Sequence, residues 1–474
     1  MALLSGLWIR PGPEEAAVGL LDGLIRDLHG GQSGTLEPGR THRAEVLSRI
    51  EATFETILTT GDRSRADRAA HGRIQRRLGD VHRHVGELVE AEKRYREAAR
   101  IFETLAREAP ETPEHGLELA RTLGNGGQAL HRAGRPVEAE KSYREGLIAV
   151  EAVAQRASKT HSAEILEVLG CIQCRLGLVL LSTGRPELGE EALRRGVVAF
   201  DRGGNASGPE AKFIRAGAHG SLGGLELANG RLPEAEARYR TAILLLSELV
   251  KEFPRAPEYL LHRVQTQYGL GLGYRRAGML FEAGRVWRES LPLAERLAAD
   301  FPAAPLHRFV LADVLVDLAG LVRILGEIEE AESLSRRAIP ALEERVAGRS
   351  GDPGDAQKLA GAFSLLVEAV MGRGDAASAV PLIEKMGLAG DANANLHAAA
   401  LLVRCMEARM ENDRPDPPFR NAQAEDYGRR AVDRLRSAVE LGLEKPQDIA
   451  GSETFRPLRG MVEFELFVEE LKRK

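Results

Sequence analysis

Large and small apolar residues recur along most of this chain in a pattern typical of paired helices. Leu78 and Gly79 lie on a predicted first helix, where a large residue beside a glycine lets a neighbouring helix approach closely. Gly86 then occupies the left-handed position that commonly ends a helix. A second helix is indicated by residues of one face at spacings of four and three, namely Ala91, Tyr95 and Ala98.

This hairpin recurs with a period of about 48 residues. The break glycine returns as Gly134, Gly184, Gly230, Gly278, Gly326 and Gly374. The small residue five positions later returns as Ala139, Gly189, Ala235, Ala283, Ala331 and Ala379. Prolines such as Pro254 and Pro257 separate the units, because proline ends one helix and readily begins the next. A pattern that keeps phase over so many units predicts one helical solenoid rather than several independent domains.

The Leu-Gly pair on the first helix and the Ala-aromatic-Ala face on the second resemble the tetratricopeptide repeat. The pair is matched at Leu78-Gly79, Leu176-Gly177, Leu222-Gly223 and Leu270-Gly271. The usual period is about 34 residues, and we assign the excess of about 14 to longer helices rather than long loops. The resemblance implies an all-α, right-handed superhelical solenoid of about eight hairpins with capping helices at both ends.

The pattern divides the chain into four parts. Residues 1–65 are expected to form N-terminal helices, at 13–29 and 41–58, with a linker between them. Residues 66–390 form seven units, residues 391–443 a degenerate eighth hairpin, and residues 444–474 the C-terminal cap. The candidate apolar residues of that cap are Phe455, Leu458, Phe464, Phe467 and Leu471.

Composition excludes some classes of function. Lys and Arg number 65 against 70 Asp and Glu, and the net charge of −5 argues against a general nucleic-acid binder. The three cysteines are too few for a disulfide framework, which favours a reducing, cytoplasmic location. The apolar start of the chain is too short to span a membrane, so no membrane insertion is expected.

Enzyme chemistry has little support in the sequence. It lacks the phosphate-loop, zinc-protease, serine-hydrolase and kinase motifs, so we expect no catalytic activity and no cofactor. Cys171 and Cys174 form a CxxC motif, which is half of a metal site, a redox pair, or two small apolar residues of a first helix. The last interpretation is favoured because the motif lies in mid-helix and no second pair follows, so no metal site is expected.

The resemblance also implies a binding surface. In tetratricopeptide arrays the first helices line the concave face, and the residues at the inward positions here are mostly cationic. They are Arg73, Arg76, Arg77, Arg83 and His84 in the first unit, Arg121, Asn125, Gln128, His131 and Arg132 in the second, and Arg175 in the third. Guanidinium groups favour carboxylates and phosphates, so the expected partner is a protein or peptide with an acidic or phosphorylated segment.

An alternative interpretation and two further observations bear on this surface. Arginine-rich helix faces are often merely solvated surfaces. The family's clamp for terminal carboxylates is matched only by Asn125 and Arg175, while Asp80 and Cys171 depart from it, so the clamp is not carried over. Further along, Tyr268 and Tyr274 are either ligand anchors or core residues.

The order of segments is also similar to the C-terminal array of large bacterial serine/threonine protein kinases. The matching residues are Asp67, Arg68, Ala70 and Leu78-Gly79-Asp80, and Leu458-Arg459-Gly460 with Phe464 at the other end. The alternative function is therefore the regulatory or sensor part of a kinase system whose catalytic domain lies elsewhere. A membrane span precedes some such arrays, which would imply a non-cytoplasmic location. Self-association through an open end of the solenoid is a further alternative.

Overall fold

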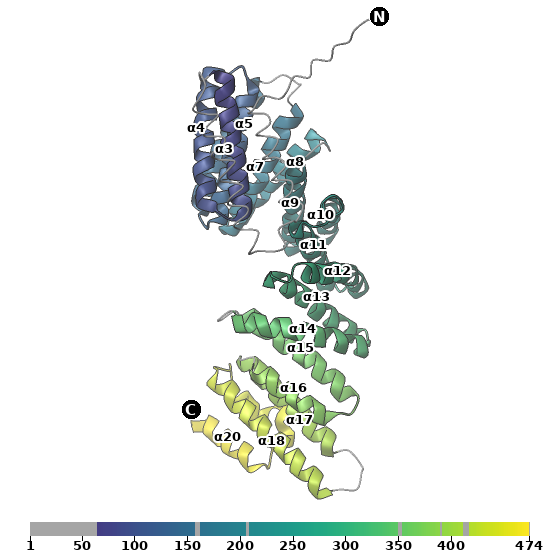
Figure 1. Cartoon of the computed structure of the whole chain (residues 1–474). Coiled ribbons are helices and arrows are strands. Elements are labelled where there is room, and N and C mark those ends of the chain that lie inside the picture. Colours follow the sequence, from purple (N-terminus) through teal and green to yellow (C-terminus); the bar gives the residue numbers. More distant parts are fainter. Residues whose placement is uncertain are drawn as a thin grey trace, which may run out of the picture. The chain divides into compact units, whose positions relative to one another are not determined.

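The computed structural model describes residues 64–156, 162–204, 208–348, 353–388, 391–410 and 417–473 (Figure 1). The chain divides into two compact units, Met1–Gly273 (unit 1) and Tyr274–Lys474 (unit 2), each described here by itself. The helices predicted at 13–29 and 41–58 lie outside the described residues.

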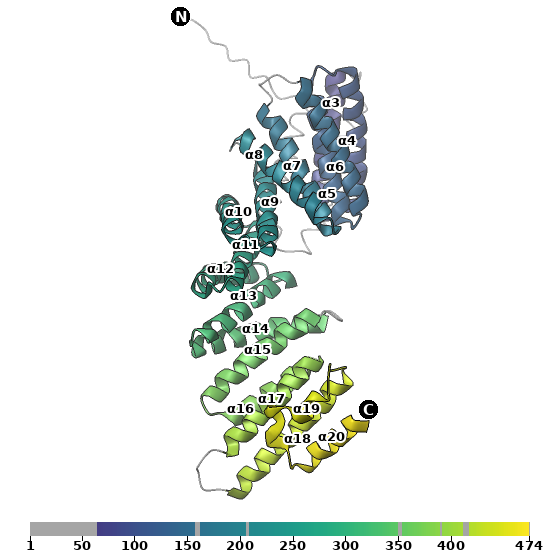
Figure 2. The ribbon, with the colours of Figure 1, turned by 180° about the vertical axis from the view of Figure 1, so that it is seen from behind.

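Unit 1 is a succession of antiparallel helical hairpins. The helix α3 begins after Ser64, whose side chain forms a reciprocal capping box with Asp67. Within each hairpin the two helices pack together, and the first helices α3, α5, α7 and α9 also pack on one another in order (Figures 1 and 2). The helices are α3 (Arg65–Val85), α4 (Leu88–Glu108), α5 (Pro113–Arg132), α6 (Pro136–Arg156), α7 (Ser162–Ser182), α8 (Pro186–Gly203), α9 (Pro209–Ala228) and α10 (Leu232–Glu252), while α11 (Pro257–Arg276) crosses the division between the units.

The break glycines have the backbone conformation that the sequence predicts. Gly134 has a φ of +76°, and its N–H donates to the carbonyl of His131, while the N–H of Arg135 donates to that of Leu130. These bonds satisfy carbonyl groups that the helix end leaves unpaired. All seven break glycines, from Gly86 to Gly374, have positive φ, so this prediction is confirmed.

The Leu-Gly pair packs as predicted at Gly79, and Gly127, which follows Gly126 instead of a leucine, packs in the same way. A Cβ atom added to Gly79 would lie 2.8 Å from the ring of Tyr95, and one added to Gly127 would lie 2.7 Å from the ring of Tyr143. Each glycine therefore makes room for the aromatic side chain of the second helix in its own hairpin. The helices α4 and α5 have 21 and 20 residues, which confirms that the long period comes from long helices.

Unit 2 continues the alternation of first and second helices and ends in shorter elements. Of the expected cap residues, Phe455, Leu458, Phe464 and Phe467 are buried and Leu471 is half-buried. The 3-10 helix η2 packs on α17 and α20 packs on α18, so the predicted C-terminal cap is confirmed. The elements are α12 (Leu280–Asp300), α13 (Pro305–Ile324), α14 (Ile328–Gly348), α15 (Pro353–Gly372), α16 (Ala376–Leu388), α17 (Ala392–Met410), α18 (Pro417–Glu440), α19 (Asp448–Gly451), η2 (Glu453–Leu458) and α20 (Val462–Arg473).

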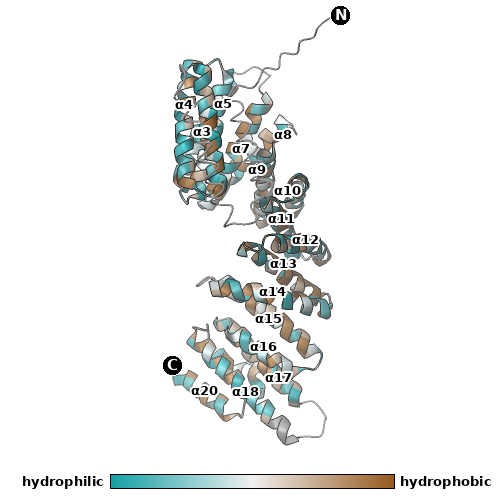
Figure 3. Cartoon of the chain, in the orientation of Figure 1, coloured by the Kyte–Doolittle hydropathy of each residue, from teal (hydrophilic) through white to brown (hydrophobic). Residues whose placement is uncertain are grey.

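The described part of the chain is all-α, and α3 to α18 form eight successive repeats of a first and a second helix. The helices carry hydrophilic and hydrophobic residues side by side, as amphipathic helices do (Figure 3). Among the described residues, α7 alone has the length and hydropathy of a membrane span, and 61% of its apolar window is buried. That burial, against α5, α6, α8 and α9, accounts for its apolar character.

Candidate functional site

The eleven predicted binding residues lie on three neighbouring first helices of unit 1. Five are on α3, five on α5, and Arg175 is on α7. Because α3 packs on α5 and α5 packs on α7, these side chains gather over one region of unit 1. A cavity of about 390 Å³ lies there, and Arg76, Arg77, Arg121 and Asn125 line it together with Arg175.

The structure separates the predicted residues by exposure. The first group is buried and consists of Arg76, Arg83, Asn125 and Arg175. The second group is at least partly accessible: Arg73, Arg77, His84, Arg121, Gln128 and His131 are half-buried and Arg132 is exposed. The first group is therefore fixed inside unit 1, and the second can meet a partner without unfolding it.

Asp80 is the centre of the buried group. Its carboxylate accepts hydrogen bonds from the Tyr95 hydroxyl and the Asn125 amide, both at 2.8 Å, and pairs with Arg76 at 3.3 Å. The side chain is 4% exposed. The departure of Asp80 from the clamp pattern therefore has a structural role, because its charge is compensated inside unit 1 and does not face a ligand.

The buried arginines each have fixed partners from more than one helix. The Nε atom of Arg76 donates to Glu118 on α5 at 2.9 Å. Arg83 donates to the hydroxyl of Tyr95 on α4 at 3.2 Å. Arg175 donates to Asn125 on α5 at 2.9 Å, and this bond links the third helical repeat to the second. These contacts fix the guanidinium groups in place, which a simple solvated arginine face would not do.

Two residues of the accessible group, Arg77 and Arg121, line the cavity. Arg121 pairs with Glu164 at 2.8 Å, and Arg77 lies 3.5 Å from Asp80. Arg132 donates to the carbonyl of Arg83 at 2.9 Å, and a ring nitrogen of His84 lies 2.6 Å from the carbonyl oxygen of Asp80. The remaining contacts are that of Gln128 with Arg175 at 3.0 Å and that of His131 with Ser182 at 3.5 Å.

Carboxylates that the sequence analysis did not single out complete the site. Glu118 pairs with Arg76; burial opposes its ionisation, but Arg76 and Arg121 outweigh that effect and lower the pKa of Glu118. Glu210, in the first turn of α9, contacts both Arg83 and Arg175. A glutamate after a helix-starting proline was visible in the sequence, but the helix dipole alone explains such a residue.

The CxxC motif is part of the packed interior. Cys174 is fully buried, and its sulfur would lie 2.4 Å from a Cβ atom added to Gly196. Burial raises the pKa of the partly buried Cys171 to about 12, which keeps its thiol protonated. Both residues lie in mid-helix on α7, as predicted. Among the described residues, no cluster of three or more His, Cys, Asp and Glu is arranged to hold a metal ion.

Two tyrosines that were left open between ligand anchor and core have different environments. Tyr274 is 2% exposed and belongs to the core, whereas Tyr268 is half-buried. Of the two roles left open, Tyr274 therefore has that of a core residue, because a ligand cannot reach its side chain.

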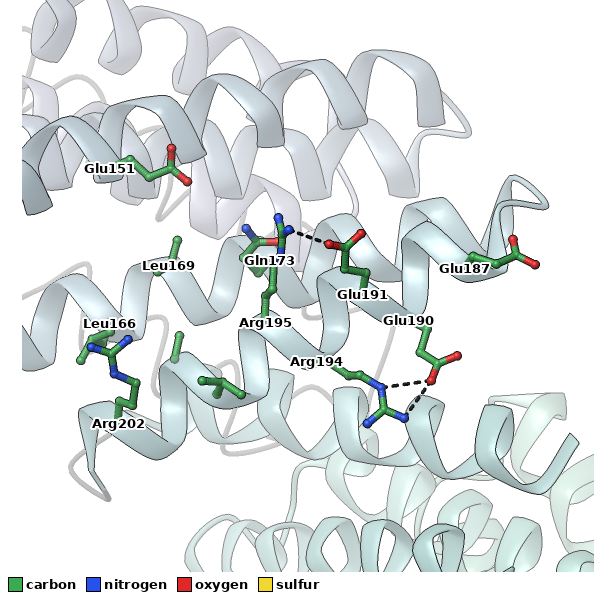
Figure 4. A pocket seen from close by; sticks show the side chains of 12 residues that line it. Glu151, Leu166, Leu169, Gln173, Glu187, Glu190, Glu191, Arg194, Arg195 and Arg202 are labelled. Carbon is green, nitrogen blue, oxygen red and sulfur yellow. Dashed lines mark hydrogen bonds and ion pairs between the residues drawn. The ribbon is translucent and has the colours of Figure 1, made fainter. Parts of the chain in front are cut away.

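A larger hollow of about 660 Å³ is bounded by α6, α7 and α8 (Figure 4). Ion pairs one turn apart on α8 border it, Glu190 with Arg194 at 2.8 Å and Glu191 with Arg195 at 2.5 Å. Pairs at this spacing are typical of a solvated helix face. None of the three arginines that line this hollow, Arg194, Arg195 and Arg202, is buried, so we place the candidate site at the smaller cavity on the first helices.

No protein-family model matches the sequence, and no curated protein matches it. Solved structures of similar architecture include BtubC from P. vanneervenii, with 18% identity, a TM-score of 0.41, and coverage of 56% of this chain and 94% of that one. The apo form of the quorum sensor NprR from B. thuringiensis has 14% identity and a TM-score of 0.41, covering 89% of this chain and 99% of NprR.

A Podosopora anserina kinesin light chain with TPR-like repeats has 18% identity and a TM-score of 0.31, and covers 49% of this chain and 96% of its own. The hairpins of the present chain are themselves tetratricopeptide-like, with a left-handed glycine between the helices and a Leu-Gly pair against the aromatic residue of the second helix. The function proposed below rests on this chain's own residues.

Proposed function

We propose that this chain is a non-catalytic scaffold and that its unit 1 binds an acidic or phosphorylated segment of a protein partner across α3, α5 and α7. The observation that carries the proposal is the cavity where Arg76, Arg77, Arg121 and Arg175 converge from these three helices. Guanidinium groups bind carboxylate and phosphate oxygens through paired, charge-assisted hydrogen bonds.

The division into buried and accessible cations suits such a site. Arg76 and Arg175 are held by side chains of neighbouring helices, so little conformational entropy is lost when they meet a ligand. Arg121 pairs with Glu164, whose side chain is 41% exposed. Exposed ion pairs contribute about 0–1 kcal/mol, so Arg121 can exchange Glu164 for a ligand carboxylate at low cost.

The test reverses the accessible charges and leaves the buried group intact. We would measure the binding of fluorescent peptides, one rich in glutamate, one with phosphoserine, and one with glutamine in place of each glutamate. The triple variant Arg73→Glu, Arg77→Glu and Arg121→Glu should lose at least about tenfold in affinity for the first two peptides.

The control carries the same change of net charge on the second helix α4, as Arg96→Glu, Arg100→Glu and Arg107→Glu, at side chains that are 59–72% exposed. It should bind the acidic peptides as the wild type does. Equal affinity of both triple variants would place the binding surface elsewhere, and equal binding of the glutamine peptide would remove the electrostatic basis of the proposal.

We also propose a cytoplasmic location, which is supported by the three free cysteines, Cys171, Cys174 and Cys405. Association with a kinase domain stays a prediction from the motifs near Asp67 and Leu458. Self-association likewise stays a prediction, which sedimentation at several concentrations would test.

A further inference from the structure

Glu210 contacts two of the three buried arginines of the predicted site, Arg83 and Arg175. Its Oε1 atom lies 2.5 Å from the NH2 group of Arg175 and 3.4 Å from that of Arg83. The two arginines lie on α3 and α7, the first helices of the first and third repeats, and Glu210 lies on α9, the first helix of the fourth repeat. One carboxylate oxygen of Glu210 therefore contacts both guanidinium groups. Among the described residues, the other carboxylate paired with Arg83 is that of Asp80, which is farther away at 4.0 Å.

The partners differ sharply in exposure. The side chains of Arg83 and Arg175 are 5% and 7% exposed, whereas that of Glu210 is 45% exposed. The carboxylate can therefore move into water without disturbing the core, while the two guanidinium groups stay where they are. The Nε atom of Arg175 is buried and has no hydrogen-bond partner among the described residues, so the cluster has an unused donor.

The arginines keep their positions if Glu210 leaves. Arg83 still donates to the Tyr95 hydroxyl at 3.2 Å, and Arg175 still donates to Asn125 and Gln128 at 2.9 and 3.0 Å. These partners are neutral, and the carboxylate of Asp80, 4.0 Å from Arg83, is shared with Arg76. Departure of Glu210 therefore leaves Arg76, Arg83 and Arg175 with only Asp80 and Glu118 as counter-charges, so the preformed site has excess positive charge. Such a site attracts another anion, because a buried charge without a counter-charge is strongly unfavourable.

We propose that Arg83 and Arg175 form a carboxylate-binding subsite, that Glu210 occupies it in the free protein, and that an acidic side chain of the ligand displaces Glu210. The ligand part of this inference rests on the proposed function, whereas the subsite itself does not. The exchange replaces one carboxylate by another, so it costs little in electrostatic energy. Since only the fraction of protein with an open subsite is competent to bind, Glu210 lowers the apparent affinity by that fraction.

The first experiment tests the subsite without any peptide. Thermal unfolding of wild type and Glu210→Ala would be followed in sodium acetate and in sodium chloride of equal ionic strength. Acetate should raise the melting temperature of Glu210→Ala by about 2–4 °C more than that of the wild type, because acetate refills the subsite. The control is Glu164→Ala, whose side chain is similarly exposed at 41% and pairs with the more accessible Arg121. Equal responses of all three proteins would overturn the proposal.

The second experiment measures the competition, with the conservative variant Glu210→Gln, which guards against a loss of folding in the alanine variant. Its affinity for the glutamate-rich peptide should rise by about tenfold over wild type, while Glu164→Gln should change it by no more than about threefold. An unchanged or lower affinity of Glu210→Gln would overturn the displacement, even if the wild type binds the peptide. If acetate selectively raises the melting temperature of Glu210→Ala but no variant binds the peptide, the result would contradict the proposed function and still support the subsite.

Discussion

Units 1 and 2 join their successive first helices by different chemistry. In unit 1, Asp80, Asn125 and Arg175 form a buried polar chain that crosses from α3 through α5 to α7. In unit 2, the buried residues of α13 are almost all apolar. The links from α13 to α15 are two partly exposed ion pairs, Asp313 with Lys358 at 2.6 Å and Arg323 with Glu368 at 3.0 Å. The same hairpin therefore tolerates two kinds of interface between repeats.

This difference indicates which contacts are required to pack the repeats and which serve the proposed binding site. A buried polar network is weak evidence for stability, because apolar residues of similar volume often stabilise a core as well or better. In unit 2, the first helices α13 and α15 pack together with largely apolar buried residues on α13, and the ion pairs that join them are partly exposed rather than buried. We infer that the network of unit 1 is present because it holds guanidinium groups in fixed positions, and the comparison of equivalent substitutions in the two units tests this.

The largest effect is expected at the centre of the network. Asp80→Ala should lower the free energy of unfolding by about 3–5 kcal/mol, because it removes the buried acceptor of Tyr95 and Asn125 as well as the anion that Arg76 and Arg83 share. Asp313→Ala in unit 2 should lose only about 1–3 kcal/mol, because Arg345 keeps Asp355 and the other partner of Asp313, Lys358, is 41% exposed. Urea unfolding, with hydrogen exchange to separate the two units, measures both. Equal losses would show that the two interfaces depend on charge to the same degree.

A smaller effect is expected from the glycines that accommodate tyrosine. Gly127→Ala should lower the free energy of unfolding by about 1–3 kcal/mol, because the new Cβ would lie 2.7 Å from the ring of Tyr143. In unit 2 an alanine, Ala319, already stands at the equivalent position, where the second helix carries Ser335 in place of the tyrosine.

The matched control is Gly217→Ala, on α9 of unit 1, where nothing lies within 4 Å of the added atom. It should stabilise the protein by about 0.5–1 kcal/mol, the usual preference of a helix for alanine over glycine. Thermal unfolding measures both variants. Destabilisation by Gly217→Ala as large as that by Gly127→Ala would contradict the packing explanation.

The fold was predictable because the residues that make each contact recur in successive repeats of the sequence. The break glycines and the Leu-Gly pairs predicted the hairpins, and the structure confirms them at Gly79, Gly86 and Gly223. Local rules failed at Pro292 and Pro340, which lie inside α12 and α14 although proline normally breaks a helix. Both are on the exposed face of their helices, so the ring does not enter the core.

The placement of the arginines on neighbouring first helices could be predicted, but their burial could not. The repeat phase put the arginines on neighbouring first helices, yet it does not tell which are buried, because that depends on partners from other helices. Asp80 is buried through contacts with Tyr95 and Asn125, residues of α4 and α5. Glu210 was missed because it is 127 residues from Arg83 in the sequence, and periodicity within one helix carries no information about such a contact.

The smallest effect concerns buried histidines, which also differ between the units. His219 of unit 1 is 5% exposed, and its ring nitrogens have no hydrogen-bond partner among the described residues. His307 of unit 2 is 7% exposed, but its Nδ1 lies 3.1 Å from the carbonyl oxygen of Phe301. Burial, together with the charges of Arg238 and Arg215, lowers the pKa of His219 from its usual 6.5 to about 4.

The sign of the pH effect follows from that direction. The unfolded chain takes up a proton near pH 6.5 and folded His219 only near pH 4, so stability that is fully present above pH 6.5 is lost as the pH falls toward 4. Between about pH 7.5 and about pH 5 the loss should be about 1–2 kcal/mol. His219→Leu should abolish this part of the pH dependence in urea unfolding. His307→Leu should instead lower stability by about 1 kcal/mol at both pH values, because it removes a hydrogen bond. If His219→Leu kept the full pH dependence, the acid sensitivity of unit 1 would have to come from its buried carboxylates, of which Glu118, with its lowered pKa, is the first candidate.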